Sequence, residues 1–131
     1  VMINAAPEAF LRYVLRSWTG NAGAIEEAAF QEYLRVFLLP GTIRCGLEDY
    51  RAAATKDFAD DEADLDKRLA CPVQALWGEL GKMHTLFDVV ATWRAKAHDV
   101  RGKALPCGHF IPEEAPEALL AELLPFLALA R

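Results

Sequence analysis

The fold class of the chain follows from the stretch Cys71-Pro72-Val73-Gln74-Ala75-Leu76-Trp77-Gly78, an apolar run bounded by proline and glycine. A run of this length and composition is typical of a buried strand. A second short strand is predicted over residues 100–105, and helical periodicity over residues 87–97 lies between the two. Strands that alternate with helices indicate a parallel sheet with helical crossovers, so the sequence predicts an α/β fold.

A last helix is predicted from Pro112 to about Leu129, because prolines and acidic residues gather at its start. Two parallel strands do not make a stable sheet alone, since parallel sheets are normally buried on both faces. The missing strands are therefore expected from elsewhere, either from the other half of a longer protein or from a second copy of the chain. The absence of a methionine at position 1 favours the longer protein.

The first part of the chain is predicted to be helical and contains no convincing strand. Helices are expected over residues 7–18, 24–39 and 42–56, with breaks at residues 20–23 and at Pro40-Gly41. Acidic residues crowd positions 57–66, which predicts a solvated connector, and the run lacks the glycine and spacing of a calcium loop. We therefore expect two segments, residues 1–66 and residues 67–131.

The composition excludes several classes of function. Lysine and arginine are scattered and the formal net charge is −5, which argues against nucleic acid as a partner. No apolar run reaches the roughly 18 residues that a membrane span needs. Cys45, Cys71 and Cys107 form no CxxC pair, which argues against a disulfide scaffold and a zinc site and favours reduced thiols in a cytoplasmic protein. No metal and no cofactor are expected.

His109 is the first candidate for chemistry, because it lies in a loop between a predicted strand and a predicted helix. Catalytic groups gather at the carboxyl ends of strands in open α/β sheets, and Gly108 would let the backbone turn tightly and approach another segment. An imidazole with a pKa near neutrality can take a proton from water. The alternative is a loop histidine that packs or meets solvent, and the residues alone leave both open.

Tyr50 is the second candidate. Helical periodicity places it on the inner stripe of the third predicted helix with Ile43, Leu47 and Ala54, where its hydroxyl could donate to an anion. The alternative is a core tyrosine. The other rings are expected to be structural: Trp77 and Trp93 in the core, and His84 and His98 on the surface.

Four blocks of the sequence resemble haloacetate (fluoroacetate) dehalogenases. They are Glu48-Asp49-Tyr50-Arg51-Ala52-Ala53-Ala54-Thr55, Asp60-Asp61-Glu62-Ala63-Asp64, residues 71–78, and Pro106-Cys107-Gly108-His109-Phe110-Ile111-Pro112-Glu113-Glu114-Ala115-Pro116. The blocks occur in the family's order and at similar separations, and the likeness extends over nearly the whole chain. The tyrosine and histidine blocks are the most specific.

The resemblance implies the C-terminal part of an α/β-hydrolase, with residues 1–66 as a helical cap segment and residues 67–131 as the last part of the core. In such enzymes an aspartate displaces halide from a small halogenated acid, and a histidine-activated water hydrolyses the resulting ester. His109 matches that histidine, and Tyr50 matches a cap tyrosine that helps to hold the departing halide. The family's nucleophilic aspartate has no match in this sequence, so the chain alone is not expected to complete the reaction.

Two other functions are compatible with the residues. An epoxide hydrolase shares the fold, the aspartate and histidine chemistry and a cap tyrosine, which would protonate an epoxide oxygen instead of holding halide. A non-catalytic remnant would instead pair with itself, since unpaired strand edges recruit other chains. The block around Tyr50 favours the dehalogenase.

Overall fold

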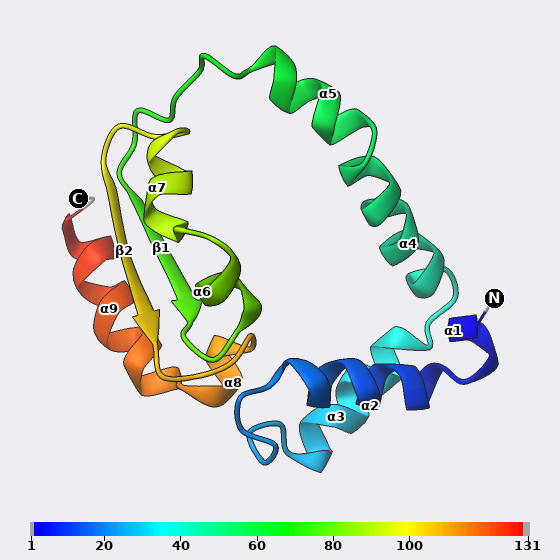
Figure 1. The fold of residues 1–131 in the computed structure, drawn as a ribbon. Helices are drawn as coiled ribbons and strands as arrows, with labels where there is room; N and C mark the ends of the chain where they lie inside the picture. The colour runs from blue at the N-terminus through cyan, green and yellow to red at the C-terminus, as the bar shows by residue number, and fades with distance from the viewer. Residues whose placement is uncertain (1, 130–131) are drawn as a thin grey trace. The chain divides into compact units, whose positions relative to one another are not determined.

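A computed structural model describes residues 2–129 of the chain (Figure 1). The chain divides into two compact units, which are described separately below. The first unit contains the residues up to Leu15 together with Glu26–Asp66. The second contains Arg16–Ile25 together with the residues from Lys67 onward. The short segment Arg16–Ile25 therefore belongs with the sheet, although it lies among helices in the sequence. The roles of cap and core stay a prediction for the two segments.

The first unit is helical, as the periodicity of the sequence predicted. Its helices are α1 (Met2–Ala5), α2 (Pro7–Trp18, up to Leu15 in this unit), α3 (Glu27–Phe37), α4 (Thr42–Ala53) and α5 (Lys56–Ala63). Phe30 and Leu34 of α3 are its buried apolar residues. The Arg12 guanidinium lies 3.7 Å from the centre of the Phe30 ring and bonds to the carboxylates of Glu8 and Glu27, which ties α2 to α3.

Helix α5 corrects one expectation. The acidic run of residues 57–66 was expected to be a connector, whereas residues 56–63 are helical and exposed. The Lys56 ammonium lies 2.7 Å from the Asp60 carboxylate one turn later, and Asp57 lies in the first turn, where the helix dipole favours an acid. Counting acids missed these local contacts, although the prediction of a solvated segment agrees with its exposure.

The second unit contains the two predicted strands, β1 (Val73–Gly78) and β2 (Val100–Leu105). They pair in parallel, with Val73 opposite Val100 and Gly78 opposite Leu105. The α/β fold class and the strand order are therefore confirmed. The helices of this unit are α6 (Lys82–Leu86), α7 (Val89–Arg94), α8 (Ile111–Glu114) and α9 (Pro116–Leu129). Its buried apolar side chains are Ala75, Ala97, Leu105 and Cys107.

Helices α7 and α9 lie on opposite faces of the strand pair (Figure 1). Side chains alternate between the two faces of a strand. On one face, Gln74 donates to the carbonyl oxygen of Glu122 in α9 at 3.1 Å, and the Lys103 ammonium pairs with the Glu122 carboxylate. On the other face, Val90 of α7 packs so closely on Gly102 that a Cβ there would lie 2.5 Å from its methyl carbon.

The helices of the second unit differ from the prediction in three places. The expected helix over residues 112–129 is two helices, because Ala115 has a φ of −147° and precedes Pro116, which disfavours the helical conformation in the residue before it. The helix expected over residues 87–97 is shorter: it begins at Val89, because the Asp88 carboxylate caps it by accepting from the Ala91 N–H at 2.9 Å, and it ends at Arg94. The short helix α6 was not predicted. Trp93 is 42% exposed, so its expected place in the core is wrong.

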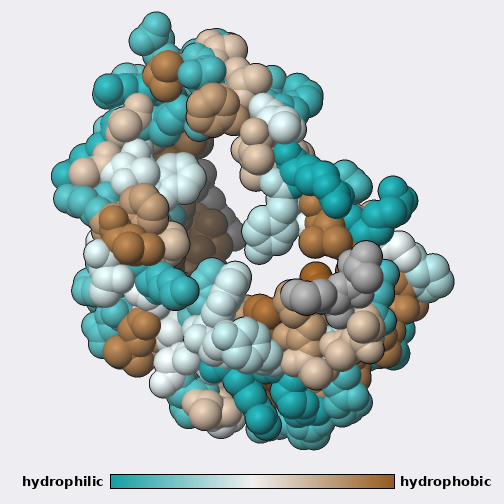
Figure 2. Space-filling view, turned by 45° about the vertical axis from the view of Figure 1, so that its right-hand side comes forward, coloured by the Kyte–Doolittle hydropathy of each residue, from teal (hydrophilic) through white to brown (hydrophobic). Residues whose placement is uncertain are grey.

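Apolar side chains remain at the surface of both units, and Figure 2 shows several of them on one face. On α9 the exposed apolar residues are Leu120, Leu124, Leu127 and Leu129. Parallel sheets are normally covered on both faces by further elements. The expectation that a partner supplies further strands to this unit stays a prediction. No helix between residues 2 and 129 combines the length and apolar character that a membrane crossing requires.

Candidate active site

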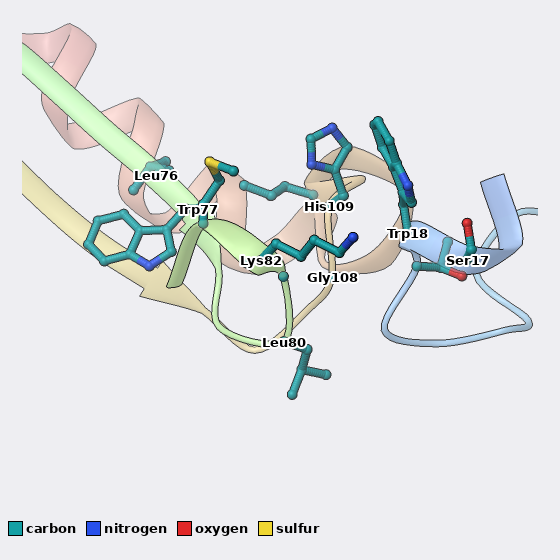
Figure 3. A pocket seen from close by; sticks show the side chains of 13 residues that line it. Ser17, Trp18, Leu76, Trp77, Leu80, Lys82, Gly108 and His109 are labelled. Atoms are coloured by element: carbon teal, nitrogen blue, oxygen red, sulfur yellow. The ribbon is translucent and has the colours of Figure 1, made fainter. Parts of the chain in front are cut away.

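His109 lies in the loop between β2 and α8, at the carboxyl end of β2 (Figure 3). Its backbone N–H donates to the carbonyl oxygen of Trp18 at 2.9 Å. The side chain is exposed. The expected position at the end of a parallel strand is therefore observed, and the loop is anchored to the end of α2 by a backbone hydrogen bond.

Two aromatic rings stand against the imidazole. The Trp18 ring centre lies 4.9 Å from the His109 ring centre at an angle of 79°, and the Phe110 ring centre lies 5.1 Å away at 88°. Edge-to-face contacts at such separations are favourable and restrict the orientation of a ring. The imidazole is therefore flanked on two sides while one side stays open to solvent.

Three glycines bring three backbone segments together beneath His109. A Cβ on Gly78, at the end of β1, would lie 1.8 Å from the carbonyl oxygen of Gly108. A Cβ on Gly108 would lie 2.1 Å from the backbone nitrogen of Gly20. Of the described glycines, Gly41 alone has a positive φ, so Gly108 serves close approach and not a left-handed turn. The loop can reach its position because no side chain separates the three segments.

The Glu114 carboxylate binds the same segments. Its Oε2 accepts from the backbone N–H groups of Gly20 at 2.7 Å, Asn21 at 3.2 Å and Gly108 at 2.9 Å. Its Oε1 accepts from Phe110 at 3.0 Å. The two residues on either side of His109 therefore donate to one carboxylate.

Cys107 is buried two residues before His109 and has a different chemistry from a catalytic thiol. Burial raises the pKa of its thiol, and the carboxylates of Glu114 and Glu79 raise that pKa further. The nucleophilic form of cysteine is the thiolate, which this environment disfavours. Cys107 is therefore a packing residue beneath the loop and not a candidate nucleophile.

A cavity of about 300 Å³ opens beside His109 (Figure 3). Its walls include the side chains of Trp18, Leu76, Trp77, Lys82, Met83 and His109. Of the described residues that line it, Lys82 carries a positive charge and none carries a carboxylate. A cavity of this kind suits a small anionic molecule with an apolar part.

The Trp77 indole in this wall is held by a histidine. Its Nε1–H donates to Nδ1 of His84 at 3.1 Å, so His84 accepts through that nitrogen. His84 is exposed, as the sequence predicted, but it also fixes an aromatic wall of the cavity. His84 does not line the cavity itself, and it acts on the cavity by holding the Trp77 ring in the wall.

Tyr50 lies on α4 in the first unit, and its side chain is 70% exposed. The stripe on which it was expected is only half-buried at Ile43 and exposed at Leu47, so its expected inward position within the unit is wrong. In this unit α4 has neighbouring helices but, among the described residues, no sheet on which to lie. Its role as a halide donor stays a prediction.

Sequence reasoning missed three residues of the site. Trp18 was interpreted only as the end of a helix, and Lys82 follows the strand in a stretch that carried no signal. Glu114 was interpreted only as an acid at a helix start. The one available signal was the position of Glu114 close after the candidate histidine, because such a carboxylate can reach back to the backbone N–H groups of the loop before it.

Relatives with named activities are similar to this chain in sequence. The chain is 33% identical to a fluoroacetate dehalogenase from Burkholderia sp over 99% of its length, and 35% identical to a soluble epoxide hydrolase from Corynebacterium sp. (strain C12) over 96%. It spans 43% and 42% of the lengths of these two proteins. A search against protein-family models found no match.

Solved structures agree in backbone as well as in sequence. A proposed acyltransferase from Salmonella enterica superimposes with a TM-score of 0.96 at 46% identity, over 99% of this chain and 43% of that one. A proposed α/β-hydrolase from Nostoc sp PCC 7120 superimposes with a TM-score of 0.93 at 48% identity, over 96% and 43%.

The fold is therefore that of part of an α/β-hydrolase, as the sequence predicted. By sequence the chain is similar to a fluoroacetate dehalogenase and an epoxide hydrolase over somewhat less than half of their lengths. The names of the similar proteins include more than one reaction, so the particular reaction is argued next from the site.

Proposed function

We propose that these residues form the histidine-bearing part of a hydrolase that cleaves the carbon–halogen bond of haloacetates. One observation carries the proposal: an anchored histidine at the end of a parallel strand borders a small cavity with a lysine and apolar walls. The named activity of the Burkholderia relative, fluoroacetate dehalogenase, supports the same substrate class.

The proposed reaction has two steps, and His109 acts in the second. An aspartate carboxylate attacks the carbon that bears the halogen, and the halide leaves with the bonding electrons, which forms an ester between enzyme and substrate. His109 then removes a proton from a water molecule, and the resulting hydroxide attacks the ester carbonyl. The products are a 2-hydroxy acid, halide and the regenerated aspartate. The aspartate has no counterpart among these 131 residues and would come from outside them.

The charge of the cavity favours an anionic substrate over a neutral one. A haloacetate carries a carboxylate next to the carbon that reacts. Among the described wall residues, Lys82 supplies a positively charged ammonium group and none supplies a carboxylate. The side chains of Leu76, Met83 and Trp77 give the cavity an apolar wall for the carbon that bears the halogen. An epoxide carries no charge and would form no ion pair with Lys82.

The test is the release of free halide. The protein, together with the residues outside these 131 that supply the aspartate, is incubated with fluoroacetate and with chloroacetate, and His109→Ala serves as the comparison. Catalytic release by the protein and stoichiometric release by the variant would support a nucleophile followed by a histidine-dependent step. Diol formation from a neutral epoxide without halide release would favour the epoxide hydrolase. An oligomer at low concentration that yields neither product would favour the self-associating remnant.

A further inference from the structure

We infer that Glu114 is a positioning residue for His109, a statement that deepens the proposed function and rests on it for its kinetic part. The carboxylate does not line the cavity and makes no hydrogen bond to the imidazole; its link to the cavity wall is the main chain of Gly108. It acts by fixing the backbone from which the imidazole projects and the backbone to which that segment is anchored.

The first argument is the pattern of donors. Gly108 and Phe110 flank His109, and both donate their backbone N–H to Glu114, at 2.9 Å and 3.0 Å. The backbone N–H of His109 itself donates to Trp18. Three consecutive N–H groups of the loop therefore have defined acceptors, and two of the three acceptors are oxygens of one side chain.

The second argument concerns the anchor on the other side. Trp18 is followed closely by Gly20 and Asn21, and their N–H groups donate to Glu114 at 2.7 Å and 3.2 Å. One carboxylate thus joins the histidine loop to the segment that supplies the acceptor for His109. Releasing the carboxylate would loosen both partners of the hydrogen bond between His109 and Trp18.

The third argument is chemical. An ionised carboxylate offers about four acceptor sites and no donor, which matches four converging N–H groups. A glutamine in its place has one acceptor oxygen, and its NH₂ group would point donors at at least one backbone N–H. Hydrogen bonds to a charged acceptor are also the stronger kind, and Glu114 is half-buried, where screening by water is reduced. Glutamate is therefore required here for its charge as well as for its length.

This arrangement matters for catalysis because a general base works only within hydrogen-bond reach of its water. A displacement of about 1 Å in such a group can cost on the order of 100-fold in rate. Loss of the Glu114 contacts is expected to slow the hydrolysis of the ester, which needs His109, and to leave the displacement of halide largely unaffected.

The experiment compares Glu114→Gln with Glu117→Gln in the protein as used for halide release. Glu117 is an exposed acid in the first turn of α9, so the control removes the same charge close by. In Glu114→Gln, hydrogen exchange at the amides of Gly20, Gly108 and Phe110 is expected to rise roughly 10-fold to 100-fold. The control should leave these amides unchanged. This readout needs no activity, so it tests the positioning even if no halide is ever released.

The kinetic readout separates positioning from general destabilisation. In Glu114→Gln, kcat should fall roughly 10-fold to 100-fold and KM should fall with it, so that kcat/KM for halide release stays within about twofold, and the first turnover of halide should persist as a burst. Glu114→Asp retains the carboxylate and should restore part of the amide protection and part of the turnover. If the glutamine variant does not fold, the aspartate variant tests the positioning role in its place. Unchanged exchange at the three amides in a folded Glu114→Gln, or an aspartate variant no better than glutamine, would overturn the inference.

Discussion

The backbone N–H of His109 donates to the carbonyl oxygen of Trp18 at 2.9 Å, while the rings of the same two residues meet edge to face at 4.9 Å. The pair is thus joined twice, once through the main chain and once through the side chains. The main-chain bond places the loop, and the ring contact limits the directions in which the imidazole can point. A substitution at Trp18 separates these two effects, because it removes the ring and keeps the carbonyl.

Trp18→Ala is accordingly expected to lower halide turnover about 2-fold to 10-fold, the equivalent of the 0.5–1.5 kcal/mol that an aromatic pair contributes beyond its buried area. The loop itself should stay in place, because its backbone anchor remains. Steady-state halide release measures the effect, and Trp18→Phe should retain part of the activity. Wild-type turnover in Trp18→Ala would show that the ring does not orient His109.

The glycine contact beneath the loop predicts a difference in stability between two chemically identical changes. Gly78→Ala would place a Cβ 1.8 Å from the Gly108 carbonyl oxygen and should destabilise the protein by about 1–3 kcal/mol or more. Gly46→Ala, on α4, meets nothing within 4 Å and should stabilise it by about 0.5–1 kcal/mol. Urea denaturation gives both values. Equal effects of the two substitutions would contradict the close approach.

The lysine in the cavity wall predicts selectivity for charged substrates. Lys82→Met should raise KM for chloroacetate about 2-fold to 5-fold, which corresponds to the modest energy of an exposed ion pair. It should leave KM for the neutral chloroacetamide unchanged. Lys82→Arg keeps the charge and serves as the control, and the effect should shrink at high salt. An equal rise for both substrates would mean that Lys82 acts through packing and not through charge.

The three cysteines are expected to differ in reactivity. Cys45 and Cys71 are exposed and should alkylate readily at pH 8, whereas Cys107 is buried and should react last, because burial and nearby carboxylates raise the pKa of its thiol. Mass spectrometry of the alkylated protein gives the order. Early modification of Cys107 would contradict the structure around the loop.

The same raised pKa fixes the sign of a stability effect. The folded protein holds the Cys107 proton more tightly than the unfolded chain does. The protonated thiol therefore contributes to the free energy of unfolding, and this contribution is fully present below the unfolded thiol pKa of about 8.5. The contribution is lost as pH rises from there through the higher pKa of the folded state. Cys107→Ala should therefore flatten the fall of unfolding free energy above pH 8.5, as urea titrations at several pH values can measure.

The strands could be predicted from sequence because their signals are local. The apolar run at residues 71–78 and the short segment at residues 100–105 each form the expected strand, and the helix beginning at Pro7 has the predicted bounds. Pro116 was also a local signal, because a proline disfavours the helical conformation in the residue before it. The apolar pattern on both sides of Pro116 nevertheless suggested one helix instead of two.

The candidate site was only partly predictable for a physical reason. His109 was found from its place after a strand, which is a local property. Trp18, Lys82 and Glu114 join it through contacts between segments far apart in sequence, and no periodicity reports such contacts. The prediction that the stripe through Tyr50 faces inward was wrong for a related reason. An apolar stripe indicates that one face of a helix can be buried, but it does not indicate which element buries that face.

The glycines at positions 20, 78 and 108 also bear on how the sequence can vary. Every single-base missense change in a glycine codon adds a side chain, and at these three positions the added Cβ would meet a neighbouring backbone or side-chain atom within 3 Å. At Gly46 and Gly23 the nearest neighbour is 3.7 Å away or farther. A saturation library selected for turnover should therefore return glycine alone at the first three codons and a mixture of small residues at the other two.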